Sequence, residues 1–139
     1  CSSDLLGLTE YKIFLSTRPE KRMGSDEVWD KAEGALKQAL ESLDLPYTIN
    51  EGDGAFYGPK LDIMFVDALK RPWQLGTLQC DFNMPIAFKL NYVGADNSEH
   101  TPVMLHRAIL GSVERFLVLV VLLSIYRIYP IAYFSHRSN

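Results

Sequence analysis

Apolar positions along the chain follow two patterns. Some stretches are short apolar runs bounded by turn residues, which is typical of strands, and others recur at helical spacing. The short runs lie at 10–16, 45–50, 61–66 and 73–82. Pro46 near the start of the second run predicts an edge strand, because proline cannot donate a hydrogen bond to a sheet. The last two runs are expected to pair through a turn at 67–72.

One long segment has helical spacing throughout. Ser25 or Asp26 is expected to cap a helix that ends near Leu43. A continuous apolar stripe on this helix predicts a face packed in the core rather than a cofactor site. The stripe consists of Val28, Trp29, Ala32, Ala35, Leu36, Ala39, Leu40 and Leu43.

Residues 101–116 change from a strand pattern to a helix pattern. An apolar strand that carries His106 is followed by Gly111 and Ser112, and Ser112 is a suitable helix N-cap. A strand that turns into a helix in this way is able to direct His106 and Arg115 at one pocket. The alternative is a buried strand packed on an amphipathic helix. The apolar positions of that helix are Val113, Phe116 and Leu117.

Glycines make residues 51–60, EGDGAFYGPK, the most irregular stretch of the chain. Glycine lets a ligand approach the main chain closely, and Tyr57 and Lys60 are the polar tips that this loop presents. The spacing fits neither a dinucleotide-binding motif nor a P-loop. On this local evidence the stretch is expected to be a hairpin connection.

Strict alternation divides the strand at 73–82 into two faces. Gln79 and Asp81 share one of them, where an amide beside a carboxylate either holds a ligand's ammonium or hydroxyl group or faces solvent. The segment 83–102 that follows is expected to be a polar connection. The first face carries Gln74, Gly76, Leu78 and Cys80, and the second carries Trp73, Leu75, Thr77, Gln79 and Asp81.

Composition and charge narrow the classes of protein that fit. The 139 residues suffice for one domain with a core, and a net charge of −3 argues against binding nucleic acid by bulk positive charge. Cys1 and Cys80 make no disulfide framework and suit a reducing compartment, either the cytoplasm or a mitochondrial matrix. No secretory or transit pattern is visible. Because residue 1 is not methionine, an upstream part is expected.

Four separated blocks carry a family resemblance: LSTRPEKRMGSDEVWDKAE, GDGAFYGPKLDI, WQLGTLQCDF and PVMLHRAILGSVERF. In this order and spacing they resemble the threonyl-tRNA synthetases, from about residue 11 to residue 117. The matching part corresponds to the second half of the class II catalytic domain and ends in its third signature motif. The resemblance implies an α/β fold of the α+β kind, with a mostly antiparallel sheet flanked by helices. It also implies ATP-dependent activation of threonine to threonyl-adenylate and transfer to tRNA(Thr).

The resemblance implies a role for each matching residue. Arg115 matches the arginine that lies against ATP, where a guanidinium is able to stack on adenine and pair with phosphate oxygens. Tyr57 and Gln79 match residues that line the threonine and adenylate pocket. Lys60, which we group with Arg115 as catalytic, and Gln74, grouped with the substrate-binding residues, lie near that pocket. Such enzymes work by orientation and charge stabilisation, with ATP and Mg²⁺, so no nucleophilic triad is expected.

His106 matches one ligand of the family's active-site zinc, which binds the amino group and hydroxyl of threonine. Valine has nearly the same shape as threonine, so an apolar pocket rejects valine only weakly. A metal coordination position that only the threonine hydroxyl is able to fill rejects valine more strongly. A zinc site of this kind needs three protein ligands and an open position. The other two family ligands lie upstream of this chain, and Cys80 and His100 are not expected to replace them, so the Zn²⁺ site is incomplete here.

Several family features are absent from the chain. These are the first motif, which builds the homodimer interface, the second motif with its phosphate-binding arginine, and the anticodon-binding domain. We therefore divide the chain into a partial catalytic domain at 1–117 and a divergent apolar tail at 118–139. The 11 residues of 116–126 are fewer than the roughly 20 that a membrane span needs, so no span is expected.

Two functional hypotheses follow from these observations. The first is a piece of a threonine–tRNA ligase, with threonine, ATP and tRNA(Thr) as partners and little activity in isolation. The alternative is a non-catalytic binding or regulatory module derived from such an enzyme and tethered by its apolar C-terminus. The matches at Tyr57, Gln79, His106 and Arg115 favour the first hypothesis.

Overall fold

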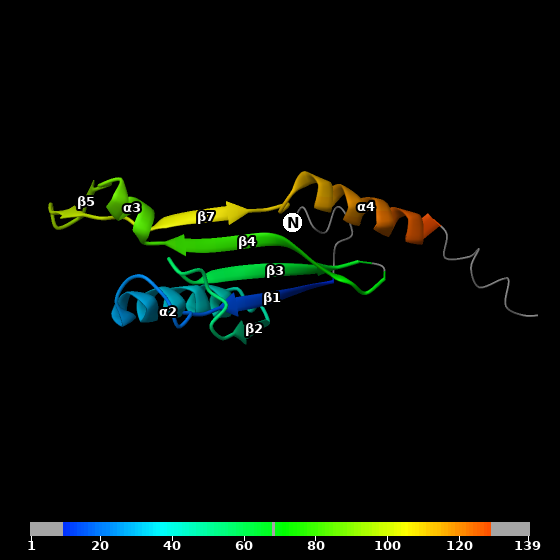
Figure 1. Ribbon diagram of the computed structural model, residues 1–139, viewed down its shortest axis with the longest axis horizontal. Helices are drawn as coiled ribbons and strands as arrows, with labels where there is room; N and C mark the ends of the chain where they lie inside the picture. The colour runs from blue at the N-terminus through cyan, green and yellow to red at the C-terminus, as the bar shows by residue number, and fades with distance from the viewer. Residues whose placement is uncertain (1–9, 68, 129–139) are drawn as a thin grey trace, which may run out of the picture.

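A computed structural model of the chain describes residues 10–67 and 69–128. Five strands form one sheet in the order β2-β1-β3-β4-β7, and β5 pairs with β6 in a separate hairpin at one end of the molecule (Figure 1). Neighbouring strands of the large sheet are antiparallel except β1 and β2, which are parallel. The expected α+β fold with a mostly antiparallel sheet is confirmed. The elements are β1 (Tyr11–Ser16), α2 (Asp26–Ser42), β2 (Tyr47–Asn50), β3 (Lys60–Val66), β4 (Pro72–Asp81), α3 (Asn83–Ala87), β5 (Tyr92–Val93), β6 (Glu99–His100), β7 (Met104–Ala108) and α4 (Val113–Ile128).

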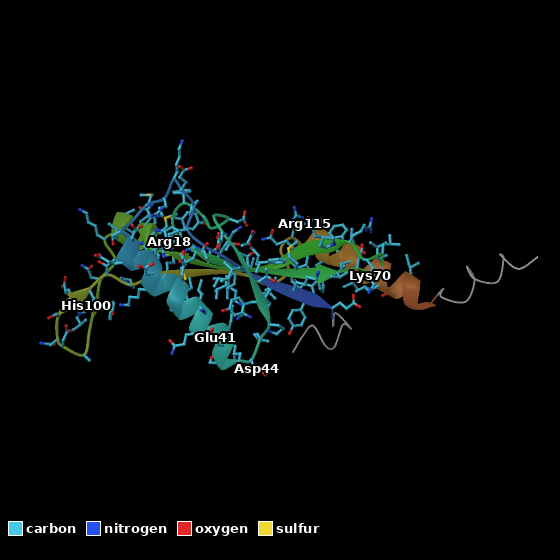
Figure 2. All side chains as sticks on the ribbon, turned by 90° about the horizontal axis from the view of Figure 1, so that it is seen from below. Arg18, Glu41, Asp44, Lys70, His100 and Arg115 are labelled. Carbon is cyan, nitrogen blue, oxygen red and sulfur yellow. The ribbon has the colours of Figure 1, made fainter. Side chains whose placement is uncertain are left out.

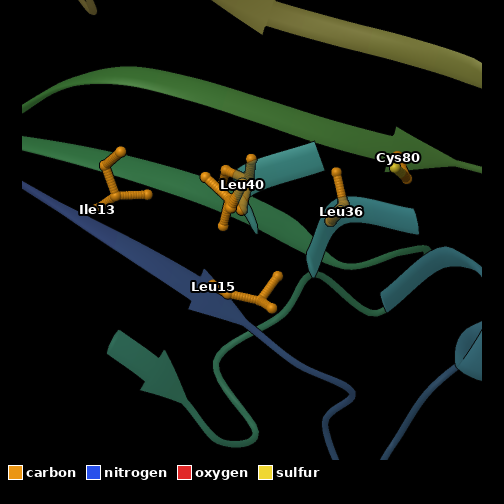
Figure 3. Close-up of a cluster of buried hydrophobic side chains, with 6 residues drawn as sticks. Ile13, Leu15, Leu36, Leu40 and Cys80 are labelled. Atoms are coloured by element: carbon orange, nitrogen blue, oxygen red, sulfur yellow. The ribbon is translucent and has the colours of Figure 1, made fainter. Parts of the chain in front are cut away.

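Helix α2 covers one end of the sheet and forms the larger core. Leu36 and Leu40 pack with Ile13 and Leu15 of β1, and the cluster extends to Leu61 and Cys80 (Figure 3). The buried stripe of α2 is narrower than the sequence pattern predicts, because the sheet contacts only one side of the helix. Buried positions are Trp29, Ala32, Leu36 and Leu40, whereas Val28, Ala35, Ala39 and Leu43 are exposed.

Helix α4 covers the other end of the sheet. Leu119 is fully buried against Leu75 of β4 and packs with Phe65 of β3. Phe65 lies four residues beyond Leu61, which belongs to the α2 cluster, so both helices lie on the same face of the sheet. Ser112 accepts a hydrogen bond from the backbone N–H of Arg115, which confirms the N-cap prediction.

Two apolar positions of α4 differ from the sequence expectation. Val113 and Leu117 are 60% and 55% exposed, because the sheet reaches only the side of the helix that carries Phe116 and Leu119. The strand before it, β7, is likewise mostly exposed rather than buried. In the part of the chain that the structure describes, no helix is long and apolar enough to cross a membrane. Residues 129–139 of the expected tail lie outside the described residues.

The loop at 51–60 is not a hairpin connection. Strand β2 pairs with β1 in parallel, and β1 separates it from β3, so the loop passes over the end of β1. Gly54 donates its backbone N–H to the carbonyl oxygen of Thr17 just after β1, which anchors this passage. The segment 83–102 is also more ordered than a polar connection, because it contains α3 and the β5–β6 hairpin.

A β-bulge in the β3–β4 pair changes which side chains share a face. Ile63 pairs with Gly76 and the next residue, Met64, pairs with Gln74, so Leu75 is the extra residue. Gln74 therefore lies on the face of Thr77, to whose Oγ1 its Nε2 donates at 3.1 Å. The strict alternation assumed from the sequence is wrong at this point, since it assigned Gln74 and Thr77 to opposite faces.

Asp67 holds the turn between β3 and β4 with a buried carboxylate. It accepts hydrogen bonds from the backbone N–H groups of Leu69 and Arg71, from Arg71 Nε and from Trp73 Nε1, at 2.7–3.0 Å. Burial raises the pKa of Asp67, but these hydrogen bonds and the Arg71 charge outweigh it and lower the pKa from 3.8 to about 2. The ionised carboxylate therefore stabilises the folded state.

We expect Asp67→Asn to lower the free energy of unfolding at pH 7 by about 2 kcal/mol. Because the folded-state pKa lies below the ordinary value, this contribution is complete above about pH 4 and is lost as the pH falls toward 2. Urea unfolding of both proteins at pH 7, well above both pKa values, and at pH 2.5, between them, measures the difference. Asp44→Asn, at an exposed carboxylate, is the control and should change stability little. A deficit equal at both pH values would contradict the assignment.

Candidate functional site

A row of polar side chains crosses the face of the sheet that the two helices leave open. Lys60 of β3 lies opposite Gln79 of β4, and Gln79 lies opposite His106 of β7. Directly paired residues of neighbouring strands place their side chains on the same face about 5 Å apart. The sheet register therefore brings three of the expected site residues together from three strands.

The glycine loop adds Tyr57 to this row. Tyr57 Oη donates a hydrogen bond to Gln79 Oε1 at 2.8 Å. The loop is fixed to β4 two residues after Tyr57, where the carbonyl oxygen of Pro59 accepts a hydrogen bond from the backbone N–H of Cys80 at 3.0 Å. Since its Oε1 is occupied, Gln79 keeps its two Nε2 protons free to donate to a ligand.

Two cavities open on this row, and both are lined by Gln79 and His106. The smaller has a volume of about 310 Å³ and lies beside the aromatic rings of Phe56 and Tyr57. The larger, of about 560 Å³, is a more open depression that runs along β7 past Thr77. A small polar ligand that occupies either cavity would contact both the amide and the imidazole.

Asp81 orients His106. Its carboxylate is 4% exposed and lies 2.8 Å from His106 Nε2, and it also accepts the backbone N–H groups of Asn83 and Met84. Burial raises the pKa of Asp81, but the hydrogen bonds from Met84, His106 and Asn83 outweigh it and hold the pKa below its ordinary value. An ionised carboxylate accepts Nε2–H, so in a neutral imidazole Nδ1 carries the lone pair that a ligand or metal would use.

Asp62 contacts two expected site residues on this face, Lys60 and Gln74. Lys60 Nζ lies 3.0 Å from Asp62 Oδ2, and Gln74 Nε2 lies 2.6 Å from Asp62 Oδ1. Burial lowers the pKa of Lys60, but Asp62 and Asp53 outweigh it and leave the pKa above its ordinary value, so the ammonium stays charged. Lys60 and Gln74 thus form one cluster, joined to the Tyr57–Gln79–His106 row where Lys60 pairs with Gln79.

Arg115 is placed apart from this cluster. It lies in the exposed first turn of α4 and lines neither of the two cavities. The preceding Gly111, with φ +65°, passes close to the carbonyl oxygen of Gln74, so the start of α4 lies beside the bulge of β4. The structure therefore places Arg115 on a helix that packs against the other face of the sheet, outside both cavities.

The described residues by themselves do not make a site for a zinc or magnesium ion. His106 with its carboxylate partner resembles a metal ligand held by an outer carboxylate, but a zinc site needs three ligands. Cys80 points into the α2 core, where burial raises the pKa of its thiol. His100 is paired with Asp96 in the β5–β6 hairpin, at the end of the molecule away from Arg115 (Figure 2). Within residues 10–67 and 69–128, no three acidic, histidine or cysteine side chains gather to hold a metal.

Comparison with known proteins defines the class. The chain matches the family model of the tRNA synthetase class II core domain (G, H, P, S and T) over residues 3–124. It is 74% identical over 114 residues to the threonine–tRNA ligase of Bdellovibrio bacteriovorus, a match that covers 82% of this chain and 17% of the ligase. It is 61% identical over 116 residues to the threonine–tRNA ligase of Paracoccus denitrificans, a match that covers 84% of this chain and 18% of that ligase.

A solved structure agrees with these matches. The chain superposes on the RNA binding domain of threonyl-tRNA synthetase from Cryptosporidium parvum with a TM-score of 0.80 and 48% identity. That match covers 86% of this chain and 30% of the other. The chain thus belongs to the class II aminoacyl-tRNA synthetases, and within them to the threonine–tRNA ligase family. It spans less than a fifth of the length of the curated relatives it matches.

Sequence reasoning missed the carboxylates of the site. Asp62 was not singled out, and Asp81 was considered only as a possible ligand contact. Both are charged residues inside largely apolar strand sequences, LDIMFV and LQCDF, and both are buried. A buried aspartate is rare unless it is paired, so its position within an apolar strand was the available signal.

Proposed function

We propose that this chain forms the second half of the catalytic core of a threonine–tRNA ligase. In this role it contributes the pocket in which threonine is activated with ATP to threonyl-adenylate before transfer to tRNA(Thr). The observation that carries the proposal is the assembly of Tyr57, Gln79 and His106 around one cavity on the open face of the sheet. These residues come from a loop and two strands, and the resemblance assigned them to one pocket independently of that geometry.

Each residue has a defined task in this proposal. Gln79, fixed by Tyr57, donates hydrogen bonds to the bound amino acid or its adenylate. His106, fixed by Asp81, supplies one ligand to a zinc ion whose other ligands come from elsewhere in the whole enzyme, where the metal would help distinguish threonine from valine. Arg115 at the start of α4 binds ATP. Catalysis then depends on orienting the two substrates rather than on a protein nucleophile.

The remaining assignments belong to the whole enzyme. The chain functions with an upstream part of the catalytic domain, in a homodimer whose interface motif lies outside it. We keep the division into a catalytic portion at 1–117 and a divergent tail at 118–139 as a proposal about sequence origin, since the boundary falls inside α4 and Leu119 just after it packs on Leu75. ATP, Mg²⁺ and tRNA(Thr) bind to the completed domain, in the cytoplasm or a mitochondrial matrix.

The proposal is tested by threonine-dependent ATP–pyrophosphate exchange. The chain alone is expected to show no exchange, because most of the relatives' length is missing. A chimaera in which residues 10–117 replace the matching segment of the Bdellovibrio bacteriovorus ligase, called the graft below, should catalyse exchange. In this graft, Gln79→Ala and His106→Ala should each lower kcat/KM for threonine about 100-fold. His100→Ala, the same change at an exposed histidine of the hairpin, is the matched control.

Two outcomes would contradict the proposal. Robust exchange by the chain alone would mean that the missing segments are dispensable. A folded graft without exchange would instead favour a non-catalytic binding or regulatory module. That second candidate is supported by the exposed apolar side chains of α4, which offer a surface for another component. They are Val113, Leu117, Val118, Val121 and Ile125.

A further inference from the structure

The carboxylate of Asp62 is the most connected group on the open face. It is 6% exposed, and each of its two oxygens has two polar side-chain partners. Oδ1 accepts Gln74 Nε2 at 2.6 Å and Thr77 Oγ1 at 3.1 Å. Oδ2 lies 3.0 Å from Lys60 Nζ and accepts Ser16 Oγ at 3.3 Å. The group therefore joins strands β1, β3 and β4 at one point.

Stability alone does not explain this arrangement. Burying an ion pair costs desolvation free energy that its Coulomb attraction repays only in part, and a well-packed apolar set of similar volume is often as stable. Asp62 and Lys60 are both on the face that carries the cavities rather than on the face that α2 and α4 cover. Their position points to a role in the site.

We propose that Asp62 is a positioning residue that orients Lys60 and Gln74 toward the substrate pocket, an inference that rests on the proposed function. An ionised carboxylate only accepts hydrogen bonds, so Gln74 has to present its Nε2 to Asp62 and keeps Oε1 free to accept from a ligand. The same carboxylate, together with Asp53, holds the Lys60 ammonium on the face of the sheet that carries Gln79. The β-bulge makes this possible, because without it Gln74 would lie on the other face.

Exchange assays on the graft test this role. Asp62→Asn keeps the shape of the side chain but lets it donate to Gln74 and removes the closer and more buried of the two carboxylate charges beside Lys60. We expect kcat/KM for threonine to fall at least tenfold, on the order of one lost charged hydrogen bond. Asp67→Asn is the matched control, an equally buried carboxylate outside the site. It should lower the unfolding midpoint but leave kcat/KM within about threefold at temperatures where the protein is folded.

A double-variant comparison separates positioning from structural support. If Asp62 acts through Gln74, its substitution should cost markedly less, by about threefold or more, in a Gln74→Ala background. An unchanged effect in that background, or a loss of activity that follows the loss of stability as in Asp67→Asn, would overturn the proposal.

A spectroscopic measurement on the 139-residue chain keeps the inference independent of activity. An ammonium group held in hydrogen bonds exchanges its protons slowly enough to give an NMR signal. The Lys60 signal should be present in the native chain and lost in Asp62→Asn, whereas its persistence would overturn the positioning role. A graft that lacks exchange while the Lys60 signal behaves as expected would contradict the proposed function alone.

Discussion

Gly58→Ala is expected to detach the glycine loop from β4 and to destabilise the fold by roughly 3 kcal/mol. A Cβ atom on Gly58 would overlap the carbonyl oxygen of Cys80, and the carbonyl carbon would lie only 2.7 Å away. Both atoms are backbone and belong to a central strand, so neither is able to move without disturbing the sheet. Because Tyr57 precedes Gly58, its hydrogen bond to Gln79 should be lost as well.

Gly34→Ala provides the matched control for this prediction. It is the same chemical change within α2, where nothing lies within 4 Å of the added Cβ, so it should stabilise the protein by roughly 0.5–1 kcal/mol. Urea unfolding followed by circular dichroism measures both variants. Opposite signs are expected, and a Gly58→Ala protein as stable as the native chain would show that the loop does not pack against β4 in this way.

Trp29→Ala is expected to lower the free energy of unfolding by roughly 3–5 kcal/mol. Trp29 is fully buried at the start of α2, and its Nε1 donates to the carbonyl oxygen of Met23 at 2.7 Å. The substitution removes a large apolar side chain and leaves that carbonyl oxygen unpaired. Since a domain is stable by only about 5–15 kcal/mol, much of the protein should be unfolded at 37 °C.

Two further variants test the cause of this loss. Trp29→Phe removes the hydrogen bond but keeps most of the apolar volume, so a smaller loss of about 1–2 kcal/mol is expected. Val28→Ala alters the adjacent, exposed position and should cost less than about 1 kcal/mol. Unfolding midpoints measured by circular dichroism compare the three proteins. Equal losses at positions 28 and 29 would contradict the placement of the helix.

Local pattern predicted most of the elements. The strands at 11–16, 60–66 and 72–81 and the helix at 26–42 agree with the apolar runs and the helical stripe to within one or two residues. The N-cap at Ser112 was also predictable, because capping depends on residues three apart in sequence. These features are encoded within a single element, so the sequence of that element suffices.

Partner choice was less predictable. The apolar run that became β2 indicated an edge strand but not that it would pair in parallel with β1 rather than with β3. The width of the buried stripe on α2 depends on which side the sheet lies. Likewise Val113 and Leu117 fit the helical pattern of α4 yet face away from the sheet. Each of these outcomes depends on a neighbouring element distant in sequence.

The expected site residues were likewise only partly placed by the sequence. Tyr57, Gln79 and His106 were expected from a family resemblance, and the structure brings them together, whereas it leaves Arg115 apart from the cavities. The proposed roles of these residues remain predictions for the assays described above.

The order of the residues alone determined the strands of the large sheet, the main helix and the family to which the chain belongs. The tertiary structure alone decided that a bulge turns Gln74 toward Asp62 and that Asp81 lies against His106. Alternation and helical spacing are short-range properties of a chain, whereas a side chain's hydrogen-bond partner is chosen by strand register. His106 and Asp81 are 25 positions apart, and only the pairing of β4 with β7 makes them neighbours.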